Sequence, residues 1–239
     1  MTLFQPRDGY RAGVDPVLLA AAVPAQSGQS LLDLGCGVGA VGLCVATRVP
    51  GLALRGVDLL AENVVLAARN GVVNDIAFDS VQGDVAALPA DLRQRSFDHV
   101  TANPPYFRRS AGPIAATAHR DQAMAGDLPL AVWVDCGIRR LAPGGRLSLI
   151  IAAERLPETL SAIGDRLGEL RVLPIAGRAG RAAGRAIVTG RKDSRAPFAL
   201  LAPLVLHAGP AHRSDAEDYT PEVAAILRDA APLLLKDRS

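Results

Sequence analysis

The stretch Leu31-Leu32-Asp33-Leu34-Gly35-Cys36-Gly37-Val38-Gly39 constrains the fold more than any other part of the chain. A short apolar strand leads into glycines at every second position, and a helix is expected from Ala40 to Arg48. Glycine accepts positive φ and lets a ligand lie against bare backbone. A glycine-rich turn between a strand and a helix is typical of nucleotide-binding turns. The spacing is not that of GxGxxG, because Gly42 falls inside the helix, and a purely structural turn is the alternative.

Carboxylates end the next two predicted strands. Asp58 closes the run Leu54-Arg55-Gly56-Val57-Asp58, and Asp84 follows Val81-Gln82-Gly83. An acid about 20 residues after a glycine turn hydrogen-bonds ribose hydroxyls in dinucleotide folds, and the same geometry suits other adenosine ligands. Asp84 is placed to accept from an adenine amine, while Asp33 is placed to order the turn and face a ligand amine. Ordinary turn aspartates are the alternative.

A fourth predicted strand, 97–102, ends in Asn103-Pro104-Pro105-Tyr106. Proline fixes φ, lacks an N–H and favours extended geometry in the residue before it, so the chain leaves the sheet as a stiff corner with free carbonyls. Asn103 adds an amide oxygen and Tyr106 a flat ring. This combination suits a planar –NH2 group such as adenine N6 or a glutamine amide. A packed edge-strand exit is the alternative.

Basic residues gather in two places. Phe107, Arg108, Arg109 and Arg120 follow the proline corner in a stretch without periodicity, which favours a substrate-holding loop for phosphates. The segment 166–195 has a basic excess that could neutralise phosphates, although a solvated face is the alternative. Its basic members are Arg166, Arg171, Arg178, Arg181, Arg185, Arg191, Lys192 and Arg195. The net charge of +2 does not by itself indicate a polyanion partner.

Composition limits the remaining possibilities. A chain of 239 residues with 49% hydrophobic residues fits one globular domain, and 4% aromatics indicates an aliphatic core. No stretch has the length of a membrane span and no signal peptide is visible, so a cytoplasmic protein is expected. Cys36, Cys44 and Cys136 form no CxxC pair, which indicates neither a disulfide framework nor a metal site.

Alternating strand and helix patterns predict an α/β fold with a doubly wound, mostly parallel sheet of about seven strands. Residues 1–29 are expected to form a loop and a short helix, 17–23, that cover the ligand site; residues 30–239 form the main domain. Tyr10, Arg11 and Asp15 are candidate contacts of that cover, with a capped helix start as the alternative. Later segments are predicted as helices at 60–73, 128–141, 155–170 and 218–230, and as strands at 146–152, 171–175, 186–190 and 198–207.

Together these motifs resemble the class I S-adenosylmethionine-dependent methyltransferases, whose fold is a Rossmann-like sheet of seven strands. The resemblance implies that the glycines hold the methionine part of S-adenosylmethionine, that Asp58 holds its ribose and Asp84 its adenine. The cofactor contacts expected on this basis are Tyr10, Arg11, Asp15, Asp33, Gly35, Cys36, Gly37, Gly39, Asp58, Leu59, Gly83, Asp84, Val85 and Asn103. The catalytic residues are expected to be Asn103, Pro104, Pro105 and Tyr106, because the corner resembles the Asn-Pro-Pro-Tyr motif of amino-methyltransferases.

Further motifs are similar to the bacterial tRNA(Val) adenine-N6 methyltransferases: Gly9-Tyr10-Arg11 with Asp15, Ala118-His119-Arg120, Leu141–Leu147 and Asp218-Tyr219-Thr220. The likeness implies methyl transfer to adenine N6 in RNA, most simply tRNA. Two positions depart from that family: Ala12 replaces a bulky aromatic, and Asp58 replaces a glutamate that is one methylene longer.

Two other functions stay open from the sequence. A protein-glutamine N5-methyltransferase acting on release factors shares Asn-Pro-Pro-Tyr, but that family has a helical domain ahead of its catalytic domain and only about 30 residues precede the first strand here. A non-catalytic module that binds S-adenosylmethionine or RNA would be expected to lose Asn103 or a glycine, and all are present. The sequence does not indicate an oligomeric state.

Overall fold

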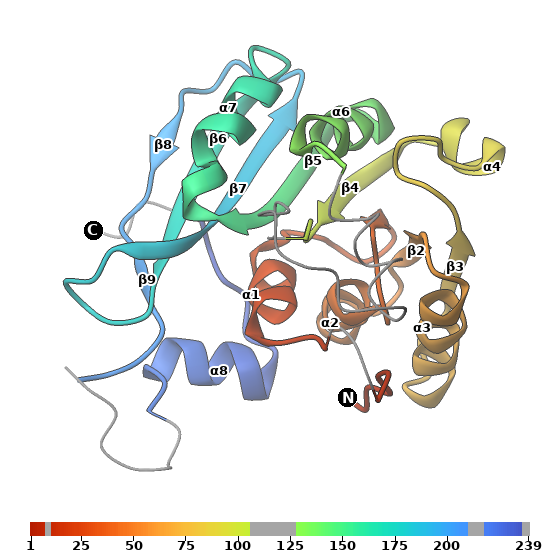
Figure 1. Ribbon diagram of the computed structural model, residues 1–239, viewed down its shortest axis with the longest axis horizontal. Coiled ribbons are helices and arrows are strands. Elements are labelled where there is room, and N and C mark those ends of the chain that lie inside the picture. Colours follow the sequence, from red (N-terminus) through yellow and green to blue (C-terminus); the bar gives the residue numbers. More distant parts are fainter. Residues whose placement is uncertain (8–10, 106–127, 210–217, 236–239) are drawn as a thin grey trace, which may run out of the picture.

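A computed structural model describes residues 1–7, 11–105, 128–209 and 218–235. In this part of the chain the strands form one sheet in the order β3-β2-β1-β4-β5-β7-β6-β8, with β9 also paired to β6 (Figure 1). The strands are β1 (Ser30–Leu34), β2 (Ala53–Asp58), β3 (Phe78–Gln82), β4 (Phe97–Ala102), β5 (Leu141–Ala152), β6 (Leu167–Ala176), β7 (Ala183–Lys192), β8 (Ala199–Leu200) and β9 (Leu204–Val205). Among these described strands, β7 alone runs antiparallel to its neighbours. The predicted doubly wound sheet is confirmed, extended by two short strands.

Helices cover both faces of the sheet, as Figure 1 shows. On one face α1 (Val14–Ala22) packs on α2 (Ala40–Arg48) and on α8 (Pro221–Asp229), and α3 (Ala61–Val73) lies beyond α2. On the other face lie α4 (Ala90–Arg93), α6 (Leu130–Arg140) and α7 (Leu156–Ile163), the last preceded by a 3-10 turn, η1 (Ala153–Arg155). No helix within the described ranges is long and apolar enough to span a membrane.

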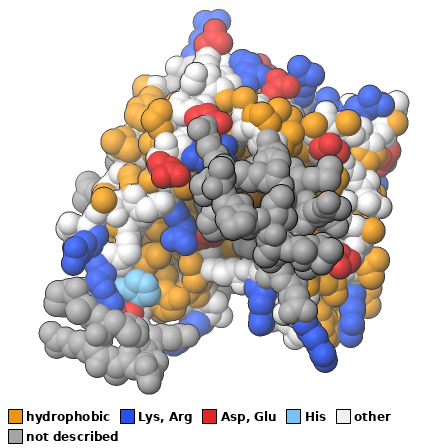
Figure 2. Space-filling view, in the orientation of Figure 1, with side chains coloured by type: hydrophobic (Ala, Val, Ile, Leu, Met, Phe, Trp, Pro, Cys, Tyr) orange, Lys and Arg blue, Asp and Glu red, His pale blue; other side chains and the backbone are white. Residues whose placement is uncertain are grey.

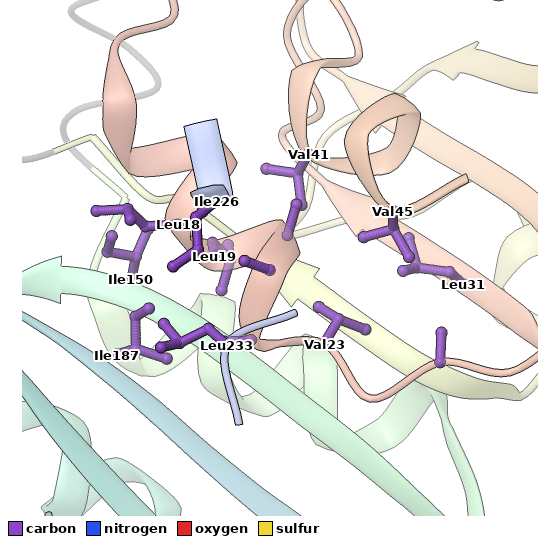
Figure 3. Packing of buried hydrophobic residues seen from close by; sticks show 14 of the residues in the cluster. Leu18, Leu19, Val23, Leu31, Val41, Val45, Ile150, Ile187, Ile226 and Leu233 are labelled. Atoms are coloured by element: carbon purple, nitrogen blue, oxygen red, sulfur yellow. The ribbon is translucent and has the colours of Figure 1, made fainter. Parts of the chain in front are cut away.

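Two aliphatic layers hold these helices against the sheet. Successive strand residues point to opposite faces, so Leu31 joins the α1/α2 layer while Leu32 joins the α6 layer. Figure 3 shows the first layer, in which Leu18 and Leu19 of α1 meet Ile150 of β5 and Ile226 of α8. Burial on both faces explains why the central strands are apolar without alternation. The helix of the N-terminal segment is therefore part of the core.

The predicted helix over 155–170 is wrong at its C-terminal end. Helix α7 ends at Ile163, and Gly164 follows with φ of 57°, a conformation suited to glycine. From Leu167 the chain is instead the first part of β6, paired with Lys192 of β7. The predicted strand over 198–207 is interrupted, because Pro203 has no N–H to donate between β8 and β9.

The parallel strands place the functional motifs at one edge of the sheet. Leu34 of β1 is in register with Val57 of β2 on one side and with Ala102 of β4 on the other. The turns that follow β1, β2 and β4 therefore meet there. The turn of the β6–β7 hairpin lies at the same edge. At this turn Ala176 pairs with Ala183, and β7 begins beside Ala152 at the carboxyl end of β5.

Candidate active site at the carboxyl edge of the sheet

The glycine turn is closed on one side and open on the other. Gly35, Gly37 and Gly39 have φ of 64°, 54° and 87°, so each uses the freedom that only glycine has at low cost. A Cβ added at Gly35 would lie 2.7 Å from the Trp133 indole of α6, whereas one at Gly37 would meet no described atom within 4 Å. Gly35 is therefore needed for packing, whereas the backbone at Gly37 has open space beside it among the described residues.

Asp58 ties the glycine turn to the end of β2. Its Oδ2 accepts a hydrogen bond from the Gly37 amide at 2.8 Å. Its Oδ1 accepts from the Leu60 amide at 3.0 Å and from Asn63 Nδ2 at 2.9 Å. The carboxylate is buried, and among the described residues Oδ2 accepts only from Gly37, which leaves one lone pair for a further donor. The shorter aspartate thus reaches the turn directly, and its contact with a ribose stays a prediction.

Asp33 is the strongly perturbed acid of the site. Burial raises its pKa to about 7, although the Thr101 hydroxyl and the Gly42 amide favour the charged form. Thr101 Oγ1 donates to Oδ1 at 2.9 Å, while Oδ2 makes no hydrogen bond of regular geometry within the described ranges. A buried carboxylate with spare acceptor capacity beside the glycine turn suits a cationic or amine donor.

The remaining predicted cofactor residues line the neighbouring turns. Asp84 is exposed after β3, and its Oδ1 accepts from the Ala86 amide at 2.8 Å. Val85 is buried and Leu59 half-buried. Gly83 donates its amide to the Asp58 carbonyl at 2.9 Å, which joins the ends of β2 and β3. Burial raises the pKa of the Cys36 thiol well above its usual range, so Cys36 contributes backbone and packing.

The proline corner begins directly after β4. Asn103 is half-buried, Pro104 is buried, and the Pro105 carbonyl accepts from Arg155 Nη1 at 3.3 Å. Arg155 lies in η1 after β5 and pairs with Glu158 at 3.3 Å. The turn that follows the neighbouring strand β5 thereby contacts the corner from the side. Tyr10, Tyr106, Phe107, Arg108, Arg109 and Arg120 lie outside the described residues, so their predicted roles stay predictions.

The cover residues differ in their surroundings. Asp15 lies in the first turn of α1 and pairs through Oδ2 with Arg185 Nε of β7 at 2.6 Å. Arg11 is exposed. The pair joins the start of α1 to the sheet at the carboxyl edge. Asp15 is therefore buried in a structural contact, and its predicted contact with a cofactor is untested.

Many basic residues of the segment 166–195 form ion pairs or hydrogen bonds within the protein. Arg166 pairs with Asp135, Arg171 with Glu169, Arg178 with Asp218 and Arg185 with Asp15. Arg191 and Lys192 donate to the carbonyls of Gly144 and Leu141. Because β7 runs away from the carboxyl edge, Arg191 lies roughly 25 Å along the strand from the turn of the β6–β7 hairpin. Arg195 follows the far end of β7. A single phosphate-binding surface over the whole segment is thus not supported. Figure 2 likewise shows Lys and Arg scattered over one face.

Several residues of this region were not predicted from the sequence. Thr101 faces Asp33 only because β1 and β4 pair in that register. Asn63 and Arg155 reach the site from α3 and η1, and Asn70 contacts the glycine turn from the middle of α3. Asn63 and Asn70 are seven positions apart in the predicted helix and therefore lie on one face of it. Two asparagines on one helix face indicate that this face contacts polar backbone or a carboxylate.

The known proteins that this chain resembles are described as methyltransferases. The family described as "Methyltransferase small domain" matches residues 13–176. A "tRNA1(Val) (adenine(37)-N6)-methyltransferase" of Dickeya chrysanthemi is 30% identical, over 93% of this chain and 88% of the relative. One with the same description from Porphyromonas gingivalis is 31% identical over 69% of each chain. A crystal structure from Agrobacterium tumefaciens, described as a predicted O-methyltransferase, has a TM-score of 0.72 at 27% identity over 92% of this chain and 98% of that chain.

Proposed function

Since the chain belongs to the methyltransferase small domain family and to the tRNA1(Val) (adenine(37)-N6)-methyltransferases, we propose that it methylates the exocyclic N6 of an adenine in tRNA, with S-adenosylmethionine as methyl donor. The observation that carries the proposal is the register of β1 with β4. It brings the open glycine turn and the Asn103-Pro104 corner to one edge of the sheet.

The residues at this edge fit S-adenosylmethionine. The bare backbone at Gly37 leaves room for the methionine part, and the buried Asp33 carboxylate suits its ammonium group. The remaining lone pair of Asp58 Oδ2 suits a ribose hydroxyl, and the exposed Asp84 suits the adenine amine. When bound, S-adenosylmethionine supplies a methyl group that its sulfonium centre already activates.

The corner orients the acceptor amine. The Asn103 side-chain oxygen and the Pro104 carbonyl accept the two amine hydrogens, which turns the nitrogen lone pair out of conjugation and toward the methyl group. Tyr106 stacks on the base. Positioning and electrostatic fit then do most of the work, and no strong base is required of the protein. Arg155 holds the Pro105 carbonyl and keeps the corner in place.

RNA recognition is assigned to the loop after the corner and to the β6–β7 hairpin. A single adenine must be splayed from the RNA and stacked on an aromatic ring before it reaches the corner. Phe107, Arg108, Arg109 and Arg120 are the proposed base and phosphate contacts. Arg181 is exposed at the tip of the hairpin, at the same edge.

Transfer of a labelled methyl group tests the function directly. The full chain is incubated with labelled S-adenosylmethionine and unmodified tRNA, with release factor as a parallel acceptor, and the tRNA is digested to nucleosides. We expect label in N6-methyladenosine. Label in release factor alone would assign the corner to glutamine chemistry, and label in a ribose or base oxygen would assign the chain to O-methylation, as in the description of its Agrobacterium neighbour.

A further inference from the structure

The first residues of the chain are fastened to α3 by a ladder of asparagine side chains. Phe4 donates its amide to Asn70 Oδ1 at 2.7 Å and receives Asn70 Nδ2 at its carbonyl at 2.9 Å. At Asn74, the C-cap residue that follows α3, Thr2 exchanges the same two bonds, at 2.8 and 2.7 Å. The Arg69 guanidinium lies 4.0 Å from the Phe4 ring centroid. We call residues 2–5 the N-terminal strap.

Asn70 differs from Asn74 in one contact. Its side chain is fully buried, and Nδ2 also donates to the Val38 carbonyl at 2.9 Å. That carbonyl belongs to the peptide group between Val38 and Gly39, whose N–H donates to the Cys36 carbonyl at 2.9 Å. Asn70 therefore fixes the orientation of a peptide plane inside the glycine turn. Asn74 instead donates to the Asn70 carbonyl at 2.7 Å and does not reach the turn within the described ranges.

We propose that Asn70 is a positioning residue for the methyl donor, which couples the docking of the N-terminal strap to the shape of the glycine turn. The inference rests on the proposed function, because it assigns the methyl donor to that turn. A ligand that holds the turn in its bound shape holds the Val38 carbonyl against Asn70, and Asn70 then holds Phe4 more firmly. By linkage, the ligand binds more weakly when the strap contact is lost, by the same factor by which the bound ligand strengthens strap docking.

The strap also reaches the beginning of α1. Gln5 Oε1 accepts a hydrogen bond from the Ala12 amide at 2.8 Å. Ala12 lies three residues before Asp15, which pairs with Arg185. The segment that precedes α1 is thus tied to the strap, and through Asn70 to the glycine turn.

Amide hydrogen exchange in the wild-type chain tests the coupling without any substitution. The Phe4 amide donates to Asn70 Oδ1, so its exchange rate reports strap docking. We expect S-adenosylhomocysteine to slow this exchange, although the strap is not among the expected ligand contacts. Binding of S-adenosylhomocysteine with an unchanged Phe4 exchange rate would overturn the inference and leave the proposed function intact.

The variants Asn70→Asp and Asn74→Ala form a matched pair. The aspartate keeps the acceptor for Phe4 but loses both donations, to Phe4 and to Val38. Asn74→Ala removes the two bonds to Thr2 and the bond to the Asn70 carbonyl, and leaves the Asn70 side chain in contact with Phe4 and Val38. We expect Asn70→Asp to raise the Kd of S-adenosylhomocysteine about tenfold, the value of one buried hydrogen bond, and Asn74→Ala to change it less than about twofold. The kcat at saturating S-adenosylmethionine should stay within about twofold for both variants.

Binding is measured by calorimetry well below the unfolding temperature of each variant, so that lost stability does not appear as lost affinity. An unchanged Kd in Asn70→Asp, or equal losses in both variants, would reduce Asn70 to a structural residue. If the wild-type chain itself bound no S-adenosylhomocysteine, the proposed function would fall and this inference with it.

Discussion

At the scale of single residues, two aspartates at the same edge of the sheet differ in the hydrogen-bond donors around them. Asp58 has three protein donors around its carboxylate. Asp33 is fully buried with fewer, and its pKa rises to about 7. The sequence places both at strand ends, but it does not show which of them is desolvated. The elements packed on both faces of the sheet bury Asp33 and raise its pKa, whereas the Thr101 hydroxyl and the Gly42 amide of α2 only partly offset that burial.

The raised pKa of Asp33 predicts a stability change with pH. The folded chain keeps the proton up to about pH 7 while the unfolded chain releases it near pH 4, so the free energy of unfolding should fall as pH rises through that window, by up to about 4 kcal/mol. Asp33→Asn should remove this slope and be more stable than wild type at pH 8. Urea unfolding at pH 5 and pH 8 measures both.

The pH dependence must be compared between wild type and Asp33→Asn, because His99 changes the free energy of unfolding with pH in the opposite direction. Burial lowers the pKa of His99 to about 4. Its contribution to the free energy of unfolding is therefore lost as pH falls from about 6.5 to about 4. His99 is common to wild type and Asp33→Asn, and its slope cancels in the difference. A difference between the two that is constant with pH would contradict the raised pKa of Asp33.

The β6–β7 hairpin shows what the sequence could and could not predict at the scale of an element. Its two strands and its basic turn follow from apolar runs flanking a glycine-rich link. The partners of its arginines do not, because they are distant in sequence: Arg185 meets Asp15, 170 residues away, and Arg178 meets Asp218. Local charge counting therefore overestimates the surface offered to RNA.

Arg181→Ala should weaken tRNA binding and reduce the slope of log K against log salt by about 1, since one phosphate contact is lost. Arg195→Ala removes the same charge from an exposed position beyond the opposite end of β7 and should leave the slope unchanged. Binding of unmodified tRNA over a salt series measures both. Equal slopes for wild type and Arg181→Ala would return the hairpin to a solvated surface.

At the scale of the whole molecule, the sheet and the meeting of its motifs at one edge were predictable because each motif is local. Apolar runs, glycines and strand-end carboxylates each carry their own signal, and parallel topology then brings them together. The N-terminal strap was not predictable, because residues 2–5 carry no periodicity and their position depends on amides of α3. Pairing register and long-range side-chain contacts are the parts that only the fold reveals.

The proposed function divides two roles at the carboxyl edge: the glycine turn holds the methyl donor and the proline corner orients the amine. Asn103→Ala tests it most directly, by calorimetry with S-adenosylhomocysteine and by initial rates with tRNA. We expect a Kd within about threefold of wild type and a kcat lower by about 10²–10³, the usual cost of losing one such oriented group. Equal losses in binding and turnover, or a turnover that survives, would contradict the division.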